Sequence, residues 1–189
     1  MTHPEAEEPR WLSEEQLASW QALMSLVMTL PAALDAQLKR DAGLNSFDYH
    51  VLAALADHPG EELGMGELAS FSQGSPSRLS HAVSRLEREG WIERSTGRAR
   101  CANARLTAAG RQKLVASAPG HVAEARRLVV DVLTPHQLEV LGEAARLVTE
   151  QADPAMADAL ARRQGGSDHL DRRSSGADDR PGSSCPQAG

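Results

Sequence analysis

The residues best suited to binding chemistry lie between Ser75 and Arg105. This stretch holds seven Arg and three Glu, so its net charge is +4, although the whole chain carries −6. Guanidinium groups bind phosphates and base edges through paired hydrogen bonds. An acidic body with one basic stripe limits non-specific adhesion and keeps one face attractive to phosphate. The distribution of charge, rather than its sum, therefore indicates a nucleic-acid partner.

The centre of this stretch is predicted to be a helix with one apolar face and one polar face. Ser75 suits the N-cap, Pro76 suits the first helical position, and Gly90 suits the residue after the last turn. Apolar residues follow at helical spacing, at 79, 82, 83 and 86. Small hydroxyls and guanidiniums occupy the opposite face, which is the composition that a helix entering the major groove needs. The predicted DNA contacts on the helix are Ser75, Ser77, Arg78, His81, Ser84 and Arg85.

The alternative to DNA binding is an amphipathic surface helix whose polar face is only solvated. The next segment favours the DNA-binding interpretation, because residues 91–94 and 101–106 can form two strands around a turn at 95–100. A helix followed at once by such a hairpin is typical of a winged helix. The wing tip is expected to probe phosphates or a narrow minor groove with its arginines. These are Arg94, Arg98, Arg100 and Arg105, of which Arg98 and Arg100 are predicted DNA contacts.

The flanking segments complete a mainly α fold with a small β wing. A helix is expected over Phe47–Asp57, capped by Asn45 or Ser46, and a shorter one over Met65–Phe71. A turn at 72–74 joins the shorter helix to the one after Ser75. We therefore assign residues 43–110 to a winged helix-turn-helix DNA-binding domain.

The first long helix carries more apolar surface than one subunit needs. Ser13 and Gln16 form a capping box after residues 1–11, which are expected to be disordered. Apolar residues then recur at three- and four-residue steps, and Pro31 is expected to kink or divide the helix. We assign residues 12–42 to dimerisation, while a wholly intramolecular core helix stays the alternative.

Helices after the wing are predicted to complete the dimerisation layer, over residues 111–153. Thr107 caps a helix running to about Leu133, with a kink or break expected at Pro119-Gly120. Thr134 begins a second capping box, which starts a last helix to about Ala152. Residues 162–189 are too polar to bury a core and are expected to be disordered.

Residue spacing favours no enzyme, metal site or cofactor. The seven His show no metal-ligand spacing, and the chain has neither a phosphate-cradling glycine loop nor partnered nucleophiles. We expect no apolar run to approach the roughly 20 residues that span a bilayer, so no membrane partner is predicted. The N-terminus is acidic and unlike a signal peptide, and two Cys form no disulfide framework. A cytoplasmic location is expected.

A longer motif resembles a known family. Residues 77–94 read Ser-Arg-Leu-Ser-His-Ala-Val-Ser-Arg-Leu-Glu-Arg-Glu-Gly-Trp-Ile-Glu-Arg, and Leu-Thr-Ala-Ala-Gly follows at 106–110. This pairing resembles the MarR family of winged-helix transcription regulators, over roughly residues 12–152. The resemblance implies a homodimer on a pseudo-palindromic operator, usually a repressor released by a small molecule or an oxidant. One departure is Arg98-Ala99-Arg100 where family wings often carry Asp-x-Arg, so the usual carboxylate brace of the wing is missing.

The resemblance also implies an effector pocket between the dimer layer and the winged helix. Candidate lining residues are Trp20, Met24, Met28 and His50, although core or interface packing explains each equally well. Cys101, beside Arg100, could be a redox-sensing thiolate, but a chance small residue on a strand is favoured. The alternative function is a winged-helix module that docks on protein. The basic, serine-rich helix argues against it, because protein interfaces favour aromatic anchors.

Overall fold

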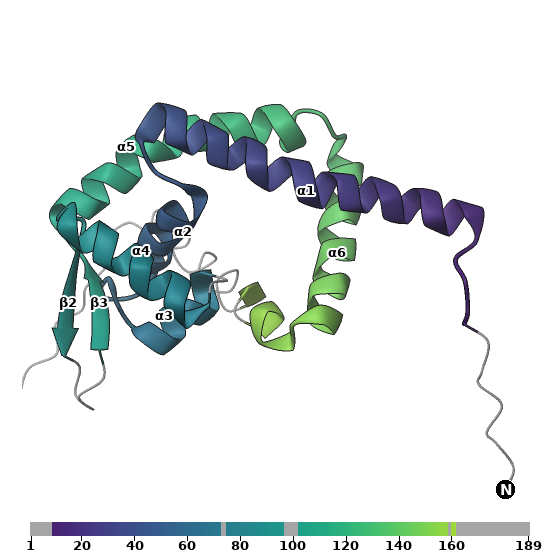
Figure 1. Cartoon of the computed structure of the whole chain (residues 1–189). Helices are drawn as coiled ribbons and strands as arrows, with labels where there is room; N and C mark the ends of the chain where they lie inside the picture. Colours follow the sequence, from purple (N-terminus) through teal and green to yellow (C-terminus); the bar gives the residue numbers. More distant parts are fainter. Residues whose placement is uncertain (1–8, 73–74, 97–101, 159, 162–189) are drawn as a thin grey trace, which may run out of the picture. The chain divides into compact units, whose positions relative to one another are not determined.

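The computed structural model describes residues 9–72, 75–96, 102–158 and 160–161 (Figure 1). The chain divides into two compact units, residues 1–140 and 141–189, and the candidate site lies in the first. The predicted terminal disorder falls mostly on residues 1–8 and 162–189, which lie outside the described residues. The elements in chain order are α1 (Glu14–Ala42), α2 (Ser46–Asp57), β1 (Glu62–Gly64), α3 (Met65–Ser72), α4 (Pro76–Arg88), β2 (Ile92–Thr96), β3 (Ala102–Leu106), α5 (Ala108–Ala125), the π-helical turn η1 (Arg126–Val130) and α6 (Pro135–Ala152).

The core joins α2, α3, α4 and the small sheet, so the predicted winged helix-turn-helix fold is confirmed. Figure 1 shows α2, α3 and α4 gathered near one end of α1, with the β2–β3 hairpin extending from them. The largest fully buried side chains are aliphatic, which suits close packing between short helices. They include Leu52 and Leu55 of α2, Leu68 of α3, and Leu79 and Leu86 of α4.

The sheet has three antiparallel strands in the order β1-β3-β2. The wing strands β2 and β3 were expected, but β1 was not, because three residues are too few to show an alternating pattern. In β1, Leu63 pairs with Ala104 of β3 and both side chains are buried. This pairing ties the start of the helix-turn-helix to the root of the wing.

The predicted helix starts are confirmed by their caps. Ser13 and Gln16 form the capping box of α1, and Asn45 accepts from the Asp48 amide at the start of α2. Ser75 caps α4, and Gly90, with φ +73°, follows its end in the left-handed conformation. Caps depend on residues three apart in sequence, so the sequence alone locates them well.

A kink or a break was expected at two prolines, and neither proline breaks its helix. Helix α1 runs unbroken through Pro31, and α5 runs unbroken through Pro119; the irregular turn comes later, at η1. A proline deprives the carbonyl four residues earlier of its helical donor. Those carbonyls belong to Val27 and Val115, residues that are 54% and 63% exposed, a setting that favours hydration of the backbone. The cost of each proline is thereby reduced.

Helix α1 leaves most of its apolar surface uncovered. It packs on α5 and α2, yet only Gln37 and Leu38 are buried among its 29 residues. By length and composition it could cross a membrane, and none of its most apolar 18-residue window is buried. The expectation that no run reaches that length is therefore wrong, because residues 17–34 contain no charged side chain. The exposed apolar side chains of α1 are Leu17, Trp20, Leu23, Leu26, Val27 and Met28.

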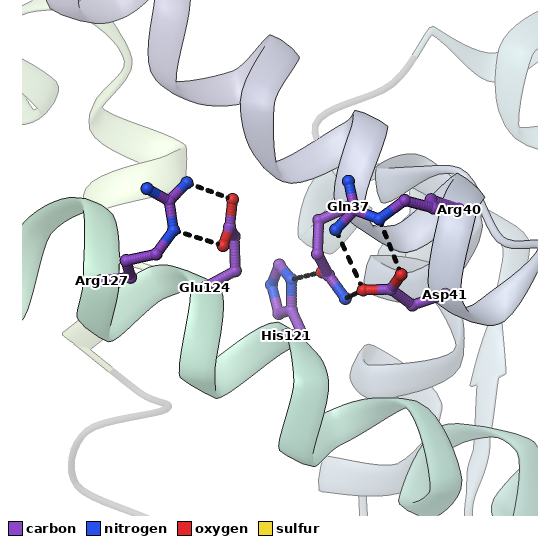
Figure 2. A network of polar contacts seen from close by, with 6 residues as sticks. All are labelled: Gln37, Arg40, Asp41, His121, Glu124 and Arg127. Carbon is purple, nitrogen blue, oxygen red and sulfur yellow. Dashed lines mark hydrogen bonds and ion pairs between the residues drawn. The ribbon is translucent and has the colours of Figure 1, made fainter.

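A polar seam joins the C-terminal half of α1 to α5 (Figure 2). Buried Gln37 donates from Nε2 to Asp41 Oδ2 at 3.0 Å, and its Oε1 lies 3.4 Å from His121 Nδ1. The His121 ring also packs on Tyr49 of α2, with ring centroids 4.6 Å apart. Burial lowers the pKa of His121, so the neutral ring is favoured. The buried amide is thus satisfied from both helices, which fixes their register.

The start of α5 is locked onto the residues that end α4. Thr107 donates from its amide to the Trp91 carbonyl at 3.1 Å and from Oγ1 to the Gly90 carbonyl at 2.7 Å. The same Oγ1 accepts from the Gly110 amide at 3.0 Å. A Cβ at Gly110 would overlap the Trp91 carbonyl oxygen. The Leu-Thr-x-x-Gly sequence at 106–110 is therefore a joint between two helices.

We expect Gly110→Ala to destabilise the fold by about 1–3 kcal/mol, because the added methyl must displace backbone. Gly66→Ala is the matched control, since a Cβ at this α3 position meets no atom within 4 Å. The control should be neutral or stabilising by about 0.5–1 kcal/mol. Urea unfolding followed by circular dichroism measures both. Equal free energies of unfolding for the two variants would contradict the close packing of Gly110 on the Trp91 carbonyl.

Candidate nucleic-acid interface

Helix α4 presents one buried face and one open face. Its apolar stripe, Leu79, Ala82, Val83 and Leu86, is buried in the core. Four of the predicted contact residues lie on the open side and are exposed: Ser75, Ser77, Arg78 and His81. Ser75 Oγ accepts from the Arg78 amide at 3.2 Å, which fixes the first turn. The start of α4 is therefore both held by a cap and exposed to solvent.

A hollow of about 820 Å³ lies beside this open face. One wall comes from α1 and the start of α2, and the other comes from α4. Three cationic side chains, Lys39, Arg78 and Arg85, and one acidic side chain, Asp35, line it, so the lining is formally basic. Lys39 pairs with Asp35, and Arg85 pairs with Asp48 outside the lining. Its lining residues are Pro31, Ala32, Asp35, Lys39, Asn45, Ser46, Phe47, Ser75, Ser77, Arg78, His81 and Arg85.

Two arginines of α4 are anchored on α2. The Arg78 guanidinium lies over the Phe47 ring, 4.3 Å from its centroid. Arg85 donates from Nε and Nη2 to the two carboxylate oxygens of Asp48, at 2.8 and 2.5 Å. Asp48 was missed by the sequence analysis, in which only its place in the first turn of a helix was visible. Its partner lies 37 residues away, a separation that no local pattern reveals.

Ser84, the remaining predicted contact on α4, is tied to the wing. Its Oγ accepts from Arg94 Nη2 at 2.7 Å, and Arg94 Nε lies 3.4 Å from Glu87. Arg94 and Arg105 belong to β2 and β3 and pair with glutamates, so placing them at the wing tip was wrong. Arg98 and Arg100, together with Cys101, lie outside the described residues.

A carboxylate braces the wing strands from β1, a strand that the sequence did not predict. Glu62 of β1 accepts from Ser95 Oγ of β2 at 2.5 Å and from Asn103 Nδ2 of β3 at 2.8 Å. These hydrogen bonds hold the pKa of Glu62 below its usual range. Because the acid belongs to β1, it ties that strand to the cross-strand pair Ser95–Asn103, one pair before the last described pair of the hairpin. A sequence reading that overlooked β1 could not assign this role.

The four effector candidates do not line the basic hollow. Trp20 and Met28 are 51% and 72% exposed on α1, Met24 is partly buried and His50 is exposed. Their assignment therefore stays a prediction. Among the described residues, no group of three or more His, Cys, Asp or Glu side chains is placed to hold a metal ion.

Comparison with known proteins places this geometry in context. The family model described as MarR family matches residues 44–98. Sco3205 from Streptomyces coelicolor, a MarR family transcriptional regulator solved in complex with DNA, is 42% identical, with a TM-score of 0.75. The match covers 81% of this chain and 97% of Sco3205. Comparison with curated proteins gave no match.

A second relative extends the likeness. AbsC, a MarR family transcriptional regulator from Streptomyces coelicolor, is 31% identical, with a TM-score of 0.72. That match covers 76% of this chain and 98% of AbsC. Sco5413 from the same organism, at 20% identity and a TM-score of 0.64, supports the fold alone.

We expect Arg94→Ala to weaken binding of duplex DNA about fivefold more than Arg105→Ala does, since freeing the wing from α4 adds an ordering cost of about 1 kcal/mol. The two variants each remove one positive charge from the wing root, and Arg105 pairs with Glu93 rather than with α4. Fluorescence anisotropy at matched salt measures the difference. Equal losses would mean that the Arg94–Ser84 contact does not position the wing.

Proposed function

Because the chain belongs to the MarR family of transcriptional regulators, we propose that it binds duplex DNA sequence-specifically through α4 and the wing. The observation that carries this proposal is the accessible, capped start of α4, with hydroxyls and Arg78 on its open face. A relative with 42% identity has been solved in complex with DNA, which supports the same partner here.

In this proposal the first turns of α4 enter the major groove. Ser77 and Arg78 reach base edges, and His81 contacts a base or a phosphate. The Phe47 ring beneath Arg78 orders the guanidinium before binding, so less side-chain entropy is lost on the DNA. Arg98 and Arg100 extend the contact from the wing to phosphates or the minor groove.

A second copy of the chain is the proposed cover for the apolar face of α1. An apolar patch spread over several turns of an exposed helix indicates a partner surface, and α5 carries further exposed apolar residues. The copy is preferred to a lipid bilayer because a two-fold dimer presents two α4 helices to half-sites about one helical turn apart. A pseudo-palindromic operator follows from that symmetry.

The dimer is proposed to act as a cytoplasmic repressor that a small molecule releases; release by an oxidant is the less favoured route. Trp20, Met24, Met28 and His50 stay the candidate effector contacts. The basic hollow offers a second location, because an occupant there would touch Arg78 and His81 directly.

A protein-docking module without DNA binding is the alternative function. An electrophoretic shift that stays negative with genomic fragments at low salt would favour that alternative.

We expect Arg78→Ala to weaken operator binding by about 1–3 kcal/mol and to relax base preference, since a base-edge contact is lost. Arg100→Ala should instead weaken binding to all sequences and reduce the salt slope by about one. Anisotropy titrations at several salt concentrations separate the two effects. Variants that change neither base preference nor salt slope would refute these assignments.

We expect the wild-type protein to sediment as a dimer without lipid, and Met28→Glu to weaken that dimer by at least about tenfold, because it buries a charge in an apolar interface. Met28 is 72% exposed in the single chain, so its own fold should tolerate the change. Sedimentation equilibrium and vesicle flotation measure the two associations. A monomer that floats with vesicles would overturn the dimer in favour of a membrane surface.

A further inference from the structure

Arg85 of α4 is committed to a buried carboxylate. The Asp48 side chain is 5% exposed, and both of its oxygens accept from one edge of the Arg85 guanidinium. Asp48 Oδ2 also accepts from Asn45 Nδ2 at 2.9 Å, which anchors the carboxylate at the start of α2. A bidentate pair of this kind fixes direction as well as distance.

The position of this pair on α4 allows it to restrict rotation of the helix about its own axis. The apolar stripe decides which face of α4 points inward, but dispersion contacts are non-directional and resist a small roll weakly. Arg85 lies seven residues after Arg78, so both arginines leave α4 on the same side, two turns apart. Both are held by α2, through Asp48 and Phe47. The flank facing α2 is therefore fixed at two points.

A direct DNA contact by Arg85 is the competing role, and it is the one that the sequence analysis predicted. The Nη1 side of the guanidinium makes no contact with Asp48 and is the only side that can meet DNA with the pair intact. A grip on guanine or a phosphate through the Nε edge would require Arg85 to leave Asp48. The carboxylate would then stay buried without its cation, which is strongly unfavourable. In addition, Asp48 already balances the Arg85 charge, so a contact here would add little counterion release.

We propose that the Asp48–Arg85 pair is an orientation clamp, in which Arg85 determines sequence discrimination by positioning α4 without reading a base itself. This inference rests on the proposed DNA-binding function. The clamp fixes the rotation of α4 about its axis relative to α2. It thereby determines the direction in which Ser77 and Arg78 point. Phosphate contacts tolerate small rotations of the helix better than base-edge hydrogen bonds do. Loss of the clamp should therefore reduce discrimination between DNA sequences more than it reduces overall affinity for DNA.

Two variants test the clamp. Arg85→Lys keeps the charge but cannot make the bidentate pair. Asp48→Asn combined with Arg85→Met removes the pair with no change in net charge and leaves no unpaired buried carboxylate. Arg88→Lys is the matched control, because Arg88 is exposed and donates to the Ser84 carbonyl of its own helix. Thermal melts verify that each variant is folded.

The measurement compares two duplexes: the site that the wild-type protein selects from a random library, and a scrambled duplex of the same length. Both clamp variants should lose about tenfold in the ratio of the two affinities, as for a mismatched site. Affinity for the scrambled duplex should stay within roughly twofold and its salt slope should not change, because backbone contacts persist. Arg88→Lys should keep the wild-type ratio.

Four outcomes would overturn the inference. An unchanged ratio in both clamp variants would show that α4 keeps its aim without the pair. A wild-type ratio in the single variant Asp48→Asn, which keeps the guanidinium and removes the carboxylate, would make Arg85 a base reader. An equal loss on both duplexes, with a salt slope about one unit shallower in the double variant, would make Arg85 a phosphate contact. A wild-type protein that selects no sequence would overturn the proposed function itself, and the clamp with it; the first three outcomes leave that function intact.

Discussion

Helix α4 has to satisfy two opposed demands, and this constraint shapes the whole winged helix. Its stripe at 79, 82, 83 and 86 must be buried to hold the core together, while the opposite face must stay open. The directional contacts therefore fall on the flanks, with Asp48 and Phe47 of α2 on one side and Arg94 of β2 bonded to Ser84. Close packing makes the helix stable, and the flanking polar contacts give it a single orientation.

Helix α1 shows the converse balance. Near the C-terminal end of α1, the buried Gln37 amide contacts His121 of α5, whose neutral form is favoured by burial. This polar contact defines the register between α1 and α5, although few residues of α1 are buried. Further toward the N-terminus its apolar side chains have no cover within the described residues of the single chain. One helix thus combines an intramolecular polar seam with an apolar surface that the described residues leave exposed.

The sequence predicted the features that depend on neighbours three or four residues apart. Helix starts at Ser13, Ser75 and Thr107 and the stripe of α4 belong to this class. It could not predict β1, whose three residues become a strand only because β3 pairs with them. Nor could it pair Asp48 with Arg85, or foresee that the helices would continue through Pro31 and Pro119, four residues after exposed valines. Each failure concerns a long-range contact or solvation, which a local pattern does not encode.

The joint at Thr107 and Gly110 has a mechanical consequence. At its first turn α5 is bonded to the peptide groups that follow α4, and farther along it meets α1 at His121. Its 18 residues form a rod of about 27 Å that is bonded at its start to the residues following α4. A tilt of α5 by a few degrees would therefore move those residues and, with them, the end of α4. Helix α5 thus couples α1 mechanically to the helix whose open face is proposed to contact DNA.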